Sequence, residues 1–224
     1  MKISVVIPVF NEEKYIDTCL SSIFNQTVLP DEIIVVDNNS TDNTTEIAKK
    51  FAVKIIPEGR QGMTYARNTG FDKATGDIIA RTDADSIVPH DWIERIKNDF
   101  TKHDIEALTG LATYDSFFTH ILNVSVYLKI MSLLQKGKST LIGPNMSITK
   151  NFWNKIRTRV CSDNTQVHED IDLGIHILKE GGKIYCDNKL IVSISSRRIK
   201  SNPVSFFVEY SIRTIRTLFF TNHR

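Results

Sequence analysis

The sequence predicts an α/β fold in which helices cover both faces of a mainly parallel central sheet. Over the first hundred residues, short runs rich in β-branched residues alternate with segments of helical periodicity, as in parallel sheets joined by crossover helices. The length of 224 residues, with 41% hydrophobic and 24% charged residues, suits one large domain of this class or two small ones. Polar and acidic residues follow three of the predicted strands, where open sheets bind ligands.

Four strands are predicted in the first half of the chain. Each is a short run rich in valine or isoleucine, and the four runs are residues 3–9, 32–36, 53–56 and 77–82. Helices are predicted over residues 12–25, about 41–51 and 64–73, and Pro89 marks the start of another. The first helix follows Asn11, which is a capping residue type, and its apolar side chains recur at helical spacing. Right-handed crossovers would bring the carboxyl ends of the strands to one edge.

The second half of the chain is less regular. An apolar run over residues 141–148 is interrupted by Gly143 and Pro144, a turn signal that either exposes backbone beside a site or simply opens a strand. A helix is predicted over residues 168–179, because two glycines follow it as a C-terminal cap. The remaining predicted elements are a weakly charged helix over residues 117–134, a strand over 190–195 and a last helix that begins near residue 203.

The composition indicates in which cellular compartment the protein is expected and which classes of partner it is expected to lack. Cys19, Cys161 and Cys186 are widely spaced, which favours free thiols in a reducing compartment over a disulfide framework or a zinc site. The amino terminus is too short and too soon interrupted by Pro8 to predict a secretory signal, and no run reaches the roughly 18 apolar residues of a spanning helix. With a formal net charge of +2, we expect a cytoplasmic protein without a nucleic-acid partner.

Acidic and polar residues follow the first, second and fourth predicted strands, at residues 10–13, 37–42 and 83–85. The pair Asp83 and Asp85 by itself is more typical of a solvated turn that caps the next helix. Three such strand ends at one edge favour a ligand site, in which carboxylates hold Mg²⁺ or Mn²⁺ with a diphosphate. No G-x-G-x-x-G follows the first strand and no G-x-x-x-x-G-K-S/T occurs, which argues against a dinucleotide site and a phosphate loop.

Four segments occur in a characteristic order in the first half of the chain. They are S-V-V-I-P-V-F-N-E-E at residues 4–13, D-E-I-I-V-V-D-N-N-S-T-D at 31–42, A-R-N-T-G at 66–70 and D-A-D at 83–85. Together they resemble the signature of family 2 inverting glycosyltransferases, and the resemblance covers about residues 3–195. It implies the GT-A fold, a nucleotide-diphospho-sugar transferase architecture.

The resemblance implies which side chains form the donor site. Asp37 would contact the nucleotide base, and three residues of the first strand and its loop would line the nucleotide pocket: Pro8, Phe10 and Glu12. Asp83 would approach the ribose or the metal, and Asp85 would bind the metal. Arg67 would either touch the diphosphate or pair with a structural acid, and the sequence leaves both alternatives open.

The acceptor side and the base are expected from the second half. Acids in the first turn of a helix complement its dipole and need no catalytic role. The pair Glu169 and Asp170, however, resembles the family's catalytic motif, which implies that Asp170 is the general base with Glu169 on the acceptor side. Asn145, in the Gly-Pro-Asn turn, is expected on the same side.

One departure from the family pattern concerns the metal. Many GT-A enzymes have a late histidine as a metal ligand, whereas the last histidine here, His223, lies at the extreme end of the chain. Arg197 or Arg198 would instead clamp the diphosphate, or both would belong to a basic surface.

The sequence therefore predicts a metal-dependent inverting glycosyltransferase, with Mn²⁺ or Mg²⁺ as cofactor. It would move a sugar from a nucleoside-diphosphate sugar to a hydroxyl or lipid-linked acceptor, in cell-surface polysaccharide, glycolipid or glycan synthesis. One alternative is a sugar-1-phosphate nucleotidyltransferase, although residues 8–13 lack the glycine- and lysine-rich loop that holds a triphosphate. The other is a non-catalytic sugar-nucleotide binding module, which would keep Asp37 and dispense with Asp170.

The C-terminal residues are expected to differ from the rest of the chain. Residues 1–196 would form the GT-A-like domain, with a nucleotide-sugar half over 1–100 and an acceptor half over 101–196. Residues 197–224 contain six basic side chains against the single acid Glu209, and are predicted as a basic amphipathic helix. Such a helix either packs in the core or in a homodimer, or lies on the cytoplasmic face of an anionic membrane.

Overall fold

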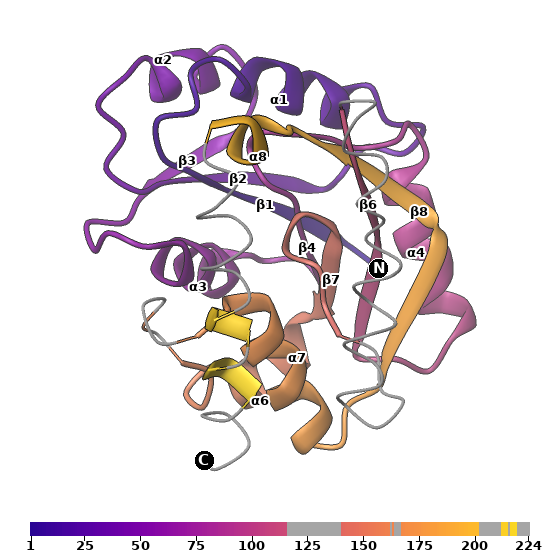
Figure 1. Ribbon diagram of the computed structural model, residues 1–224. Helices are drawn as coiled ribbons and strands as arrows, with labels where there is room; N and C mark the ends of the chain where they lie inside the picture. The colour runs from indigo at the N-terminus through magenta and orange to yellow at the C-terminus, as the bar shows by residue number, and fades with distance from the viewer. Residues whose placement is uncertain (116–139, 162, 164–166, 202–211, 215, 219–224) are drawn as a thin grey trace.

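The computed structural model describes residues 1–115, 140–161, 163, 167–201, 212–214 and 216–218. In these residues eight strands form one sheet, and helices cover both of its faces (Figure 1). The strands are β1 Ile3–Val9, β2 Glu32–Asp37, β3 Lys54–Pro57, β4 Ile78–Arg81, β5 Ser86–Ile87, β6 Ala107–Tyr114, β7 Met146–Thr149 and β8 Ile184–Ile194. The arrangement confirms the predicted α/β class with a central sheet flanked by helices.

The sheet is parallel where the sequence predicts it and mixed elsewhere. Across the sheet the strands follow the order β3-β2-β1-β4-β7-β6-β8-β5. The pairs β1 with β2, β1 with β4, and β2 with β3 are parallel. β7 runs antiparallel to both β4 and β6, β5 is antiparallel to β8, and β6 is parallel to β8. The carboxyl ends of β1, β2 and β4 therefore meet at one edge, as the predicted crossovers require.

The helices differ from their predictions mainly at the ends. They are α1 Ile16–Phe24, α2 Thr44–Ala48, α3 Met63–Lys73, α4 Trp92–Lys102, α6 Lys150–Ile156, α7 Glu169–Lys179 and α8 Arg197–Ser201. α1 begins later than predicted, because the backbone N–H groups of Tyr15 and Ile16 both donate to the Glu12 carbonyl at 2.9 Å and form a turn. α2 is shorter than predicted, and β5, β6 and α6 are not predicted at all.

The predicted helix over residues 117–134 lies outside the described residues, as does most of the predicted last helix. In the latter, residues 212–214 and 216–218 are described and are helical. None of the helices in the described ranges is both long enough and apolar enough to cross a bilayer.

The central strand β1 shows why the sequence needs continuous apolar runs. All seven of its residues are buried. Val5 and Ile7 belong to an apolar cluster with α1 and α4, whereas Val6 belongs to a second cluster with α3, α6 and α7. Because side chains along a strand alternate between the two faces of a sheet, a strand covered on both faces needs an apolar residue at each position.

Asn145 is the first predicted site residue that the structure corrects. The short 3-10 helix Gly143–Asn145 (η2) leads into β7 and leaves the Asn145 side chain 1% exposed. Its amide nitrogen donates to the carbonyls of Leu111 and Leu190 at 2.8 Å each, and its amide oxygen accepts from the Trp92 indole at 2.9 Å. These contacts join β6 to β8 beside their shift in register. Asn145 is therefore a buried link between strands and does not face an acceptor.

Replacing Asn145 with Ala is expected to lower the free energy of unfolding by about 3 kcal/mol or more, because three buried polar groups lose their partner. Chemical denaturation of the two proteins measures the difference. The matched control is Asn154→Ala on the exposed side of α6, which should change stability by less than about 0.5 kcal/mol. Equal effects of the two substitutions would contradict a structural role for Asn145.

Candidate active site

The loops after β1 and β2 form one wall of the candidate site. The side-chain oxygen of Asn11 accepts from the Thr41 N–H at 2.8 Å, and the Asn11 N–H donates to the Ser40 hydroxyl at 3.1 Å. Asn11 and Asn39 have left-handed backbones, with φ of 55° and 67°, a conformation that Asn adopts more readily than most residues. The two loops are thus joined at the sheet edge.

Two of the predicted nucleotide-binding residues are accessible on this wall. Phe10 follows the buried strand β1 directly, yet its side chain is 47% exposed. Asp37 ends β2 and is partly exposed, and one of its carboxylate oxygens accepts from the Ser40 N–H at 3.1 Å. Pro8 is buried within β1, opposite Val36 of β2. An exposed aromatic ring near a carboxylate offers a stacking surface and a hydrogen-bond acceptor to a planar ligand.

Asp83 and Asp85 lie just beyond β4, and each is paired with an arginine. Asp83 accepts from the guanidinium of Arg81 at 2.8 Å. Asp85 accepts from Nε of Arg197 at 3.1 Å, and the same guanidinium also pairs with Glu12. The ends of β1 and β4 are thereby connected through one arginine, which the chain supplies from the start of α8.

Arg197 is the predicted clamp residue that the structure brings to the acid edge. Its guanidinium lies 4.6 Å from the centre of the Tyr15 ring. Burial lowers the pKa of Arg197, but the hydrogen bond and charge of Glu12 and the charge of Asp85 outweigh burial and raise it. Arg198 lies next to it in α8, and its side chain is outside the described part.

The side chains at the end of β4 fit a divalent cation that binds together with a phosphate group. Asp83 and Asp85 offer carboxylate oxygens, and their side chains are 28% and 15% exposed. Among the residues described, no group of three or more His, Cys, Asp and Glu side chains is placed to hold a metal ion. Two carboxylates suit Mg²⁺ or Mn²⁺ when phosphate oxygens and water complete the coordination shell. The arrangement therefore fits a metal that arrives with a diphosphate.

Asp170, the predicted base, is held at the first turn of α7. Its Oδ1 lies 2.8 Å from Nδ1 of His168 and accepts from the Ile171 N–H at 2.8 Å, and its Oδ2 accepts from the Gly143 N–H at 3.0 Å. Burial raises the pKa of this carboxyl group, but the charge and hydrogen bond of His168 and the charge of Arg81 outweigh burial and lower the pKa to about 2. Asp170 is therefore an anion with a fixed orientation at neutral pH.

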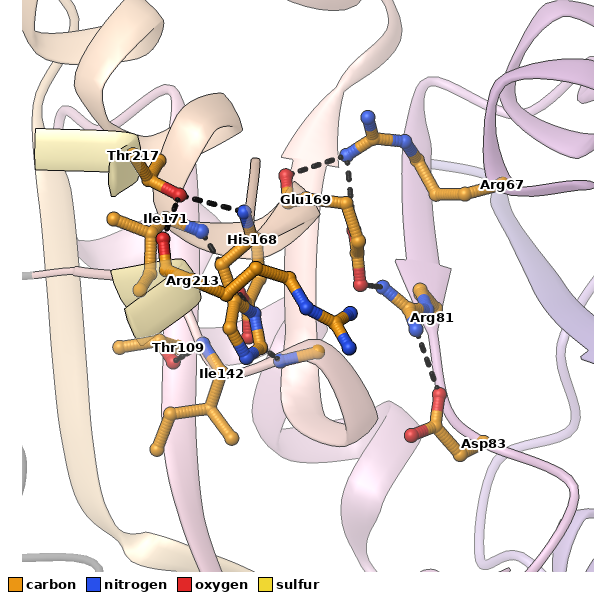
Figure 2. A network of polar contacts seen from close by, with 12 residues as sticks. Arg67, Arg81, Asp83, Thr109, Ile142, His168, Glu169, Ile171, Arg213 and Thr217 are labelled. Carbon is orange, nitrogen blue, oxygen red and sulfur yellow. Dashed lines mark hydrogen bonds and ion pairs between the residues drawn. The ribbon is translucent and has the colours of Figure 1, made fainter. Parts of the chain in front are cut away.

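Glu169 lies between two buried arginines, as Figure 2 shows. One carboxylate oxygen accepts from Arg67 at 3.2 Å, and the other pairs with Arg81. Arg67 is fully buried and Arg81 is 1% exposed. These contacts use both carboxylate oxygens of Glu169, and Arg67 has no exposed surface. The structure therefore corrects the predicted acceptor-side role of Glu169 and favours one of the two alternatives for Arg67. Glu169 balances buried charge instead of facing an acceptor, and Arg67 pairs with a structural acid, the second of its two open alternatives.

Arg81 and His168 are functional candidates that sequence reasoning missed. Arg81 ends the apolar strand β4, and a charge at such a position needs a buried partner, so the pattern contained a usable signal. Arg81 contacts Asp83 on one side and Glu169 on the other, which connects the acid pair to the helix that carries Asp170 (Figure 2). Nothing in the local sequence signals the contact of His168 with Asp170.

The comparisons with known proteins identify the family and the fold of the chain. A model of the family described as "Glycosyl transferase family 2" matches residues 4–158 of the chain. "Glycosyltransferase GlyA" of Streptococcus pneumoniae is 33% identical over 141 residues, which are 58% of this chain and 20% of that protein. A relative from Methanococcus voltae is 26% identical over 94% of this chain and 70% of its own length. Its name is "Dolichyl N-acetyl-alpha-D-glucosaminyl phosphate 3-beta-D-2,3-diacetamido-2,3-dideoxy-beta-D-glucuronosyltransferase".

The solved structures show the same fold. The mannosyltransferase PcManGT from Pyrobaculum calidifontis, determined in complex with GDP-Man and Mn²⁺, superimposes with a TM-score of 0.80 at 19% identity. The match covers 100% of this chain and 64% of that structure. The chain spans between 20% and 38% of the length of three of its curated relatives, so those proteins contain further sequence.

Proposed function

We propose that this chain, which belongs to glycosyl transferase family 2 and has the GT-A fold, transfers a sugar from a nucleoside-diphosphate sugar to a hydroxyl or lipid-linked acceptor with inversion at the anomeric carbon. The observation that carries the proposal is the series of contacts from Asp83 through Arg81 to Glu169. These contacts support the proposal, because they connect the acid pair to the helix turn that holds Asp170. Activation of a donor and deprotonation of an acceptor require this proximity, because both must act on the same reacting atoms.

The nucleotide would bind at the ends of β1 and β2. The exposed Phe10 ring would pack on the base or ribose, and Asp37 would accept hydrogen bonds from the base. Pro8 would shape the pocket from within β1. Glu12 would hold Arg197, whose guanidinium would provide positive charge for the diphosphate.

Asp85, with Asp83 beside it, would hold Mn²⁺ or Mg²⁺ together with the donor. The mannosyltransferase of the same fold, crystallised with GDP-Man and Mn²⁺, supports this assignment. When bound, such an ion neutralises the negative charge that develops on the leaving diphosphate. Two carboxylates would leave most ligand positions of the ion to the donor and water, so donor binding is expected to depend on the metal.

Asp170 would act on the acceptor. It would accept the hydroxyl proton as the acceptor oxygen attacks the anomeric carbon from the face opposite the diphosphate. In this single displacement the bond to the acceptor oxygen forms while the bond to the diphosphate oxygen breaks, which inverts the anomeric centre. If the attacking group is instead a lipid phosphate, which is already an anion, Asp170 would position it. The name of the Methanococcus voltae relative supports a lipid-linked acceptor, as in glycolipid or cell-surface glycan synthesis.

A screen of sugar nucleotides for release of nucleoside diphosphate, with and without Mn²⁺ or Mg²⁺, tests the proposal. We expect metal-dependent release from at least one donor. Release of pyrophosphate from a nucleoside triphosphate and a sugar phosphate would identify a nucleotidyltransferase instead. Binding of a sugar nucleotide without release, in the presence of lipid and sugar acceptors, would identify a binding module.

We also propose that the outward side of the C-terminal segment, residues 212–218, contacts an anionic membrane. Ile212 is 50% exposed and Arg216 is exposed, whereas Thr217 is buried. Reversal of one basic charge near an anionic surface changes the binding free energy by about 2 kcal/mol, so Arg216→Glu should weaken binding to anionic vesicles at low salt by about tenfold or more. A vesicle sedimentation assay measures this.

The matched control for this prediction is Lys50→Glu, because Lys50 is exposed just after α2. Figure 1 shows α2 well away from the C-terminal segment. It carries the same change in net charge and should bind vesicles as the wild type does. Wild-type protein that ignores anionic vesicles at low salt, where screening is weakest, would contradict the membrane contact.

A further inference from the structure

Among the described residues, the carboxylate of Asp170 has three hydrogen-bond partners, and one of them, the imidazole of His168, is titratable. The backbone N–H groups of Ile171 and Gly143 donate at 2.8 and 3.0 Å, and they donate at every pH. The third partner is Nδ1 of His168, at 2.8 Å. Because an ionised carboxylate only accepts hydrogen bonds, Nδ1 carries a proton in this contact whether the imidazole is neutral or charged. His168 is therefore the contact through which the proton affinity of Asp170 can change.

The C-terminal segment holds His168 at its backbone. The His168 N–H donates to the Thr217 hydroxyl at 2.6 Å, and that hydroxyl donates to the Arg213 carbonyl at 2.7 Å. Thr217 is fully buried, and Leu218 packs against the apolar side of α7. Figure 2 shows Thr217, Arg213 and His168 next to one another. A polar contact and an apolar contact thus join residues 212–218 to the first turns of α7.

We propose that His168 is a positioning residue for the base Asp170, and that the C-terminal segment keeps His168 in place through Thr217. This inference rests on the proposed function, in which Asp170 accepts the acceptor proton. The carboxylate has one contact from α7, one from η2 and one from His168, so loss of the imidazole removes one of three constraints on its orientation. His168 and Thr217 act through Asp170 and need no contact with substrate.

The charges around His168 predict a pH dependence. The charges of Asp170 and Glu169 on α7 and of Arg213 on the C-terminal segment act on the imidazole. Burial and Arg213 lower the pKa of His168, but the two carboxylates, Asp170 above all, outweigh them and raise it. A charged His168 stabilises the Asp170 anion and so makes it a weaker base, whereas a neutral His168 keeps the hydrogen bond without the charge. Turnover is therefore expected to rise as the pH rises through the raised pKa of His168.

The contact itself can be measured without any activity. We expect an NMR titration of the imidazole protons in the full chain to give a His168 pKa above its ordinary value of about 6.5. In Asp170→Asn that pKa should fall, because the substitution removes the charge. The ion pair should also stabilise the fold fully below about pH 6.5, and this contribution should be lost as the pH rises through the raised folded-state pKa.

Variants of both residues test the positioning role. His168→Ala should lower turnover by about 10- to 100-fold with an unchanged KM for the donor, since it loosens the base and leaves the donor site alone. His168→Asn, whose amide nitrogen can take the place of Nδ1, should recover most of the turnover and lose the pH-dependent rise. Thr217→Val should lower turnover in the same direction, and the matched control Thr214→Val on the same segment should not. If His168→Ala does not fold, His168→Asn and Thr217→Val still test the positioning role.

Two results would overturn the inference. One is a His168 pKa at or below its ordinary value that does not respond to Asp170→Asn. The other is a His168→Ala enzyme with wild-type turnover and an unchanged pH profile. A chain that shows the expected titration but releases nucleoside diphosphate from no donor overturns the proposed function, and with it the role of His168 beside a base.

Discussion

Replacing Asp170 with Asn is expected to lower turnover by about 10²- to 10⁴-fold while donor binding stays nearly unchanged. The amide has the size of the carboxylate and can still accept from the Gly143 or Ile171 N–H, but it cannot take a proton from the acceptor. Steady-state release of nucleoside diphosphate, together with the KM for the donor, measures both quantities. Donor binding that falls in proportion to turnover would instead assign Asp170 to the nucleotide site.

Stability measurements separate this catalytic effect from a folding defect. The folded-state pKa of Asp170 is lowered to about 2, so its carboxylate stabilises the fold at pH values above its ordinary pKa, and that contribution is lost as the pH falls through the lowered value. Asp170→Asn should lack this part of the acid-range stability while remaining folded at neutral pH. The control Asp17→Asn, an exposed acid in α1, should match the wild type in turnover and in thermal unfolding.

Replacing Asp85 with Ala is expected to abolish both transfer and metal-dependent nucleotide binding. The alanine side chain offers no oxygen to a divalent cation. The other carboxylate of the acid pair, Asp83, has one of its oxygens in an ion pair with Arg81. Calorimetric titration of the donor with and without Mn²⁺ measures the binding, and nucleoside diphosphate release measures transfer. We expect metal to enhance donor binding in the wild type and to have no effect in the variant.

The fold should survive this substitution. Asp85 is one of two carboxylates that pair with Arg197, and Glu12 remains as the other. The control Asp17→Ala removes an exposed acid of α1 that has no proposed role in the site, and it should bind donor normally. Full activity of Asp85→Ala in a buffer that contains a chelator would exclude a role for Asp85 in holding a metal.

Local sequence patterns were sufficient to predict the strands in the first half of the chain. β1, β2 and β4 are continuous apolar runs, and they were predicted within about one residue because a strand buried on both faces tolerates few polar positions. The two-residue strand β5 and the strand β6, which contains Thr109 and Gly110, carry no comparable pattern. β8 begins earlier than predicted. The prediction missed its first residues because they include polar side chains and show no regular alternation of apolar and polar residues. These strands form through their partners in the sheet more than through their own residues.

The candidate site likewise has residues whose place the sequence predicted and residues whose role it did not. The acids at the ends of β1, β2 and β4 could be placed at one edge from the sequence, since crossover direction alone brings those ends together. Asn145 and Glu169 could not be assigned correctly, because a polar residue at a turn or helix start looks the same whether it faces a ligand or a buried partner. For Arg67 the sequence left two alternatives open for the same reason. Only the contacts made across the fold separate the two cases.

Sequence patterns predicted the α/β class, the parallel half of the sheet and, through the resemblance, the family and the sheet edge proposed for the donor. The folded chain was needed to reveal the pairing of Arg81 with Asp83 and Glu169, the place of Arg197 between Glu12 and Asp85, and the contact of the C-terminal segment with His168. This difference follows from the range of the interactions. Periodicity and turn chemistry act over a few neighbouring residues, whereas a buried charge takes its partner from whichever distant segment packing brings within hydrogen-bond distance.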